Sequence, residues 1–113
     1  MPINTQNLDN GVTVVLVEGR IDIKGAQEID MPMMLIAGSK RAVVIDMTGV
    51  TFLASLAIRS MLLCAKSIVS KKGSCVMYGP IEDVREVLET AGIDTIIPIH
   101  TDLDEAIAAV MPA

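Results

Sequence analysis

The feature that most constrains the fold is an apolar run enclosed between Arg41 and Asp46, with no polar residue inside it. Because this run does not alternate polar and apolar side chains, it predicts a strand buried on both faces, as in a parallel sheet. Parallel strands require crossover connections, which are usually helices. The run therefore predicts an α/β fold whose sheet is covered by helices.

A connection over residues 47–53 follows this strand and leads into a helix predicted over residues 55–71. Leu56 and Leu63 project into the polar side of that helix. This exposed pair beside Ser55 is a candidate contact surface, although isolated exposed leucines are also common without any function. At 100° per residue, the inward side is predicted to hold Ala57, Ile58, Met61, Leu62, Cys64, Ala65, Ile68 and Val69, and the polar side Arg59, Ser60, Lys66, Ser67, Ser70 and Lys71.

The N-terminal part predicts an antiparallel hairpin, because residues 2–8 and 12–18 read as strands around the turn signal Asp9-Asn10-Gly11. A helix is predicted within residues 24–38. Pro32 falls in its middle, where a continuous helix loses about 3 kcal/mol. The helix therefore either kinks at Pro32 or is shorter, with Pro32 in its first turn.

The C-terminal part predicts two more strands and two more helices. Residues 74–78 form a strand, and Gly79-Pro80 opens a helix. A last strand covers residues 95–99, with Pro98 indicating an edge or a strand end, and Thr101 caps the final helix. The apolar stripes of these helices are Ile81, Val84, Val87, Leu88 and Ala91, then Leu103, Ala106, Ile107 and Val110. The order of strands and helices implies a mostly parallel sheet.

Composition narrows the classes of function. The 113 residues are expected to form one domain, residues 1–113, with 9 basic and 14 acidic residues and a net charge of -5. This balance disfavours nucleic acid and anionic membranes as partners. No apolar run approaches the roughly 20 residues that span a bilayer, and the N-terminus lacks a signal-peptide pattern. We expect a cytoplasmic protein with Cys64 and Cys75 reduced and buried; a disulfide between them is the alternative.

Signatures of enzymes are largely missing from the sequence. One histidine and two separated cysteines do not form a recognisable zinc site, and no Gly-rich phosphate loop or G-x-S-x-G elbow occurs. We therefore expect no enzyme activity, cofactor or metal; a Ser55–His100 nucleophile pair is the enzymatic alternative. Asp46 either caps the loop after its strand or presents a functional carboxylate. Asp22 either caps the first helix or presents charge beside Ser55.

Ser55 is the candidate site of a charge switch, because it falls at the predicted start of a helix. Helix starts present unpaired N–H groups and the positive end of the helix dipole. A phosphate on Ser55 is therefore electrostatically tolerated at this position.

Three motifs, taken in order, resemble the STAS domains and, more narrowly, the bacterial anti-sigma factor antagonists. Residues 19–22 are similar to the family's G-x-[LI]-D, residues 44–52 to its V-x-D-L-x-x-V-x-F, and Gly92-Ile93 to its late G-[LI]-x-x-x-[FI]. The resemblance covers essentially the whole chain. It implies the STAS fold, a mixed and mostly parallel sheet with an N-terminal hairpin and four helices.

The family's switch segment, D-S-[ST]-G, corresponds here to Ala54-Ser55-Leu56-Ala57. The resemblance implies that Ser55 is a phosphoacceptor and that the partner is an anti-sigma factor and serine kinase of the histidine-kinase-like ATPase type. The departures at the other three positions change the chemistry around the serine, because an acid is lost and apolar surface is gained. The implied partner-binding residues are Asp22, Thr51, Leu56, Arg59 and Leu63.

Two other classes of function remain as alternatives to a partner-switching regulator. The first is a STAS-type module that binds a nucleotide or another small ligand and has no phospho-switch, as the departures around Ser55 allow. The second is a small enzyme of unknown chemistry, against which stands the lack of a paired acid and base.

Overall fold

The structure is a computed structural model that describes residues 2–112. Strands and helices follow one another in the predicted order, beginning with two strands and then alternating helix and strand. The elements are β1 (Ile3–Asn7), β2 (Thr13–Ile21), α1 (Ile23–Ser39), β3 (Ala42–Leu53), α2 (Ser55–Ser70), β4 (Ser74–Tyr78), α3 (Glu82–Thr90), a short 3₁₀ helix η1 (Ile93–Thr95), β5 (Ile99–His100) and α4 (Leu103–Val110).

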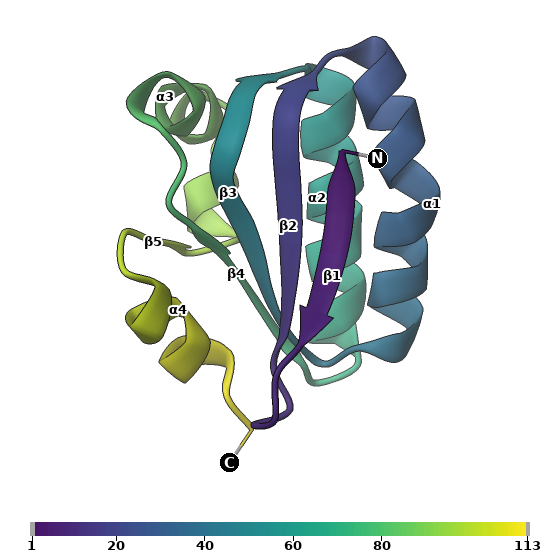
Figure 1. Ribbon diagram of the computed structural model, residues 1–113, viewed down its shortest axis with the longest axis vertical. Coiled ribbons are helices and arrows are strands. Elements are labelled where there is room, and N and C mark those ends of the chain that lie inside the picture. Colours follow the sequence, from purple (N-terminus) through teal and green to yellow (C-terminus); the bar gives the residue numbers. More distant parts are fainter. Residues whose placement is uncertain (1, 113) are drawn as a thin grey trace.

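The strands form one mixed sheet in the order β1-β2-β3-β4-β5 (Figure 1). β1 pairs antiparallel with β2, which confirms the predicted hairpin. The other neighbouring strands pair in parallel, so the sheet is mostly parallel. β3 lies at the centre of the sheet, as its apolar sequence predicts.

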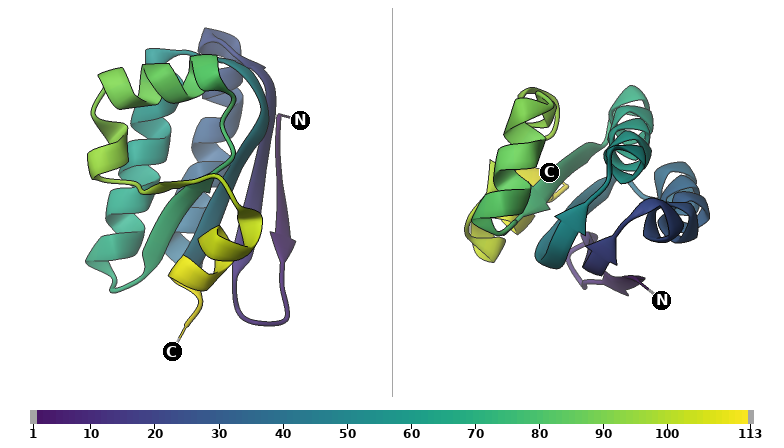
Figure 2. Two further views of the ribbon diagram at one scale, coloured as in Figure 1. Left: turned by 90° about the vertical axis from the view of Figure 1, so that its left-hand side faces the viewer. Right: turned by 90° about the horizontal axis from the view of Figure 1, so that it is seen from above.

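Helices cover both faces of the sheet. α1 and α2 lie side by side on one face, and α4 packs on the opposite face (Figure 2). Successive side chains of β3 alternate between the two layers: Val43 and Ile45 pack toward α1 and α2, whereas Val44 packs in the cluster with α4. Both faces of this strand are therefore buried, which is why its sequence does not alternate.

β3 is longer than predicted, because the expected loop over residues 47–53 continues the strand as far as Leu53. Its second half pairs with the end of β2 through two register shifts. Gly49 allows this close pairing, since a Cβ at that position would lie 2.9 Å from the Cβ of Glu18. The local sequence Met-Thr-Gly favours a loop. Residues 47–53 nevertheless form a strand, because they pair with β2, which is distant in the sequence.

α1 runs unbroken from Ile23 to Ser39 with Pro32 inside it, so the alternative of a shorter helix with Pro32 in its first turn is wrong. Its inward side chains are buried on both sides of the proline, including Ile29 before it and Met33 and Ile36 after it. Burial of such side chains contributes about 1.5–3 kcal/mol each. This gain offsets the cost of the proline.

The C-terminal third differs from the prediction in three places. Residues 93–95 form the 3₁₀ helix, and β5 is confined to Ile99–His100 at the sheet edge, directly after Pro98. The final helix is capped by Asp102, not Thr101, because the Asp102 carboxylate accepts a hydrogen bond from the N–H of Asp104.

In α3 the buried apolar residues are Val84 and Leu88, whereas the predicted inward residues Ile81, Val87 and Ala91 are exposed.

Candidate functional site

Ser55 is the first residue of α2 and is exposed. The preceding residue, Ala54, is the N-cap and supplies no side-chain hydrogen bond, and the first turn of α2 contains no acidic residue. The N–H of Ala54 donates to the carbonyl oxygen of Ile21 at 2.8 Å, which fixes the start of α2 against the end of β2. The exposed Ser55 therefore stands at an electropositive helix start that is hydrogen-bonded to the end of β2.

Asp22 directly follows the residue to which Ala54 is bonded, so it lies at the same end of the sheet as Ser55. Its carboxylate accepts a hydrogen bond from the N–H of Gly25 at 2.9 Å and caps α1. The capping interpretation is confirmed. Thr51 is exposed on the last part of β3, where the neighbouring Phe52 ring stacks under the Arg20 guanidinium at 4.2 Å.

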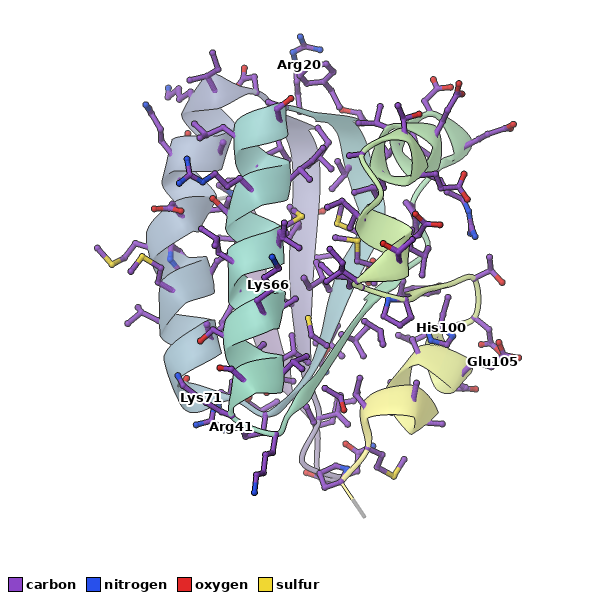
Figure 3. All side chains as sticks on the ribbon, turned by 180° about the vertical axis from the view of Figure 1, so that it is seen from behind. Arg20, Arg41, Lys66, Lys71, His100 and Glu105 are labelled. Carbon is purple, nitrogen blue, oxygen red and sulfur yellow. The ribbon has the colours of Figure 1, made fainter. Side chains whose placement is uncertain are left out.

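Leu56, Arg59 and Leu63 share the outward side of α2 and line a groove between α1 and α2 with a volume of about 730 Å³. The two leucines are 42% and 55% exposed, as the helical pattern predicts. Met34, 63% exposed, stands on the α1 side of the same groove. The two helices that form the walls lie side by side in Figure 3, with Lys66 and Lys71 labelled along α2. The structure thus brings three of the predicted partner-binding residues together.

A hydrogen bond joins the two walls of this groove. The Ser60 hydroxyl donates to the Asp30 carboxylate at 2.8 Å. Ser60 is 7% exposed, so its predicted place on the polar side of α2 is wrong. Val69, predicted to face inward, is 56% exposed. Both differences arise because α1 packs along one flank of α2 and leaves the other flank open, which a helical wheel does not show.

Asp46 and His100 lie far from Ser55. Asp46 accepts hydrogen bonds from the N–H and the hydroxyl of Thr48, so it caps the local backbone as expected. Asp46 pairs with Tyr78 of β4, and Tyr78 pairs with His100 of β5, so these three residues lie side by side across the sheet. From Asp46, β3 continues to Leu53, and Ser55 follows only after that strand has ended. At about 3.3 Å per residue this separates Ser55 from His100 by on the order of 20 Å. The Ser55–His100 nucleophile pair is therefore wrong.

The cysteines and other candidate metal ligands form no metal site among residues 2–112. Cys64 and Cys75 are both buried and unbridged. Within residues 2–112, no group of three His, Cys, Asp or Glu side chains is arranged to hold a metal ion. No helix in that part of the chain combines the length and apolar character needed to cross a membrane.

The chain is similar to known proteins over nearly its whole length, and the model of the STAS domain family matches residues 5–106. BtrV of Bordetella bronchiseptica, which is named as an anti-sigma factor antagonist, is 26% identical over 106 residues, covering 93% of this chain and 91% of BtrV. The crystal structure of an anti-sigma factor antagonist from Mycobacterium paratuberculosis has a TM-score of 0.86 at 27% identity, covering 97% of this chain and 93% of that one.

The fold is also that of the anti-sigma factor antagonist SpoIIAA of Bacillus, in two states. Its unphosphorylated form has a TM-score of 0.78 and its phosphorylated form 0.72, each at 16% identity, covering 95% of this chain and 94% and 97% of the respective SpoIIAA chains. At this identity the likeness shows the fold alone. The family model spans most of the sequence, and the motifs and topology agree with it: the chain belongs to the STAS domain family.

Proposed function

We propose that this protein is a regulatory binding module of the anti-sigma factor antagonist type, which captures an anti-sigma factor and thereby frees a sigma factor. The observation that carries the proposal is the exposed Ser55 at the start of α2, next to the exposed Leu56, Arg59 and Leu63. Apolar surface beside an electropositive helix start suits a protein partner. Asp22 and Thr51, at the same end of the sheet, complete the proposed contact surface.

The relatives support this role. BtrV and the Mycobacterium paratuberculosis protein are both named as anti-sigma factor antagonists, and each matches more than nine-tenths of this chain. The Bacillus protein SpoIIAA, which shares the fold, exists in a phosphorylated form. We therefore propose that the partner is an anti-sigma factor of the histidine-kinase-like ATPase type that also phosphorylates Ser55.

Phosphorylation of Ser55 is proposed to end binding through charge alone. A phosphate adds about -1.5 to -2 charges at the centre of the contact surface. Burying this charge against a partner without a matching cation is costly. Arg59 lies four residues further along the same helix, the spacing at which side chains meet, so the phosphate also draws this cation away from the partner, and no refolding is required.

The test measures capture of the purified cognate anti-sigma factor by the wild type, Ser55→Ala and Ser55→Asp. We expect Ser55→Ala to bind like the wild type and Ser55→Asp to bind at least tenfold more weakly. Incubation with the same partner and ATP, followed by mass mapping, should place one phosphate on Ser55. Equal capture of all three proteins, with no phosphate at Ser55, would remove the switch; failure of the wild type to bind would remove the proposed role.

The second candidate function is binding of a nucleotide or another small ligand. The volume of the groove between α1 and α2 favours this candidate. About 730 Å³ falls within the range of small-molecule sites. A ligand present at 100 times its dissociation constant should stabilise the fold by about 2.7 kcal/mol. A thermal-shift screen of nucleotides, read on the wild type and Leu63→Asp, decides this candidate.

A further inference from the structure

The basic residues of this acidic chain are concentrated on α2 and the turn after it. Residues 55–72 hold four of the nine basic residues, namely Arg59, Lys66, Lys71 and Lys72, and none of the fourteen acidic ones. The start of α2 adds the positive end of the helix dipole, and no acidic residue or side-chain cap neutralises it there. An acidic partner, repelled by the rest of the surface, is attracted to this helix.

The groove beside α2 has the shape and lining that an amphipathic helix requires. It extends from Leu56 to Lys71, so it is about 22 Å long at 1.5 Å per residue, or about four helical turns. Met34 and Leu63 offer exposed apolar side chains from opposite walls. Methionine side chains adapt to the shape of a bound apolar surface.

The charges along the two walls differ, which orients a bound helix. On the α2 wall, Arg59 lines the groove and is exposed. Among the described residues, no carboxylate lies within 4.0 Å of its guanidinium. On the α1 wall, Asp30 is the acidic residue, and one of its carboxylate oxygens already accepts the Ser60 hydrogen bond. An acidic flank is therefore favoured on the α2 side of the groove and disfavoured on the α1 side.

We propose that the α1–α2 groove binds a helix of the partner that has an apolar face and an acidic flank directed toward Arg59. This inference rests on the proposed function, because it names the part of the partner that the α2 surface captures. It also extends the switch. A phosphate on Ser55 engages Arg59 and repels the acidic flank, so one modification at the end of the groove weakens contacts along it.

The test uses the full-length protein and two synthetic 18-residue peptides with the same leucine face, one flanked by glutamates and the other by lysines. Fluorescence anisotropy should show the glutamate peptide binding at least tenfold more tightly, with affinity falling as salt is raised. Leu63→Asp should weaken this binding at least tenfold. The matched control is Val69→Asp, on the same helix and equally exposed but outside the groove, which should change binding less than twofold.

Reversal of charge tests the orientation. The Arg59→Glu variant should bind the glutamate peptide at least tenfold more weakly and gain affinity for the lysine peptide. Binding of neither peptide, equal binding of both, or equal effects of Leu63→Asp and Val69→Asp would overturn the proposal. So would a wild-type dimer that Leu63→Asp makes monomeric, because the occupant would then be a second copy.

Capture of the purified anti-sigma factor separates this inference from the proposed function. If Ser55→Asp abolishes capture while Leu63→Asp leaves it unchanged, the groove proposal fails and the regulatory role stands. If the wild type does not bind the anti-sigma factor but still binds the glutamate peptide through the groove, the regulatory role fails and the groove remains a helix-binding site.

Discussion

The two sides of α2 carry equally large apolar residues but differ in what those residues do. Met61 and Ile68 on the inner side are fully buried, whereas Leu56 and Leu63 on the outer side are exposed. Side chains that remain in water contribute little to folding. One helix therefore has two distinct sides: its inner side packs on the sheet, and its outer side remains accessible and forms part of the proposed contact surface.

The largest effect should come from truncating the inner side. Ile68→Ala leaves a cavity in the core and should lower the free energy of unfolding by about 2–5 kcal/mol. Leu63→Ala should lower it by less than about 0.5 kcal/mol, because its side chain is already exposed. Urea unfolding of both variants measures the difference, and similar losses would contradict the division between the two sides.

The same comparison shows how far the sequence predicts the molecule. The hairpin, the order of elements, the exposed Ser55 and the two outward leucines follow from local patterns. Ser60 does not, because its burial depends on α1 packing against that flank of α2. Local sequence also fails to predict the second half of β3, because its strand form requires pairing, through shifted register, with β2 residues that lie 31 or 32 positions earlier in the chain. The groove has no signal in the sequence, because it is formed by the spacing of two helices.

The second prediction concerns Cys64, which is 3% exposed and lies at the boundary between the inner side and the groove. Burial raises the pKa of its thiol from 9.0 to about 11. Burial, with a further contribution from Cys64, raises the pKa of Cys75 still more. Since the unfolded chain ionises first, stability is fully present below pH 9 and is lost as the pH rises toward 11.

This loss should reach about 1.4 kcal/mol per pH unit for each thiol that is ionised only in the unfolded chain. Unfolding in urea at a series of pH values measures it. The control is the Cys64→Ala and Cys75→Ala double variant, in which the decline above pH 9 should be much smaller. An unchanged decline in that variant would assign the effect to other groups.

The third prediction concerns Asp22, which lies where the end of β2 meets the start of α2. Asp22→Ala removes the cap of α1 and should lower the free energy of unfolding by about 1 kcal/mol. Asp22→Asn keeps an accepting oxygen and should cost less. Because the proposed contact surface includes this carboxylate, we expect Asp22→Asn to weaken capture of the anti-sigma factor severalfold, and unchanged capture would restrict Asp22 to capping.

The smallest effect concerns the hydrogen bond between Ser60 and Asp30, which ties the wall formed by α1 to the wall formed by α2. A double-mutant cycle of Ser60→Ala and Asp30→Ala should give a coupling energy of about 0.5–1.5 kcal/mol. Ser67→Ala, on the same side of α2 but seven residues further along, is the control and should show no coupling to Asp30→Ala.

This coupling also bears on recognition, because the bond lies inside the groove and not beneath it. If the two walls are fixed by this bond, Ser60→Ala should weaken binding of the glutamate peptide by more than its small cost in stability explains, since the groove then loses its preformed width. A coupling energy near zero would mean that apolar packing alone sets the spacing of α1 and α2. In that case the width of the groove on the outer side of α2 would be set by the core packing on its inner side.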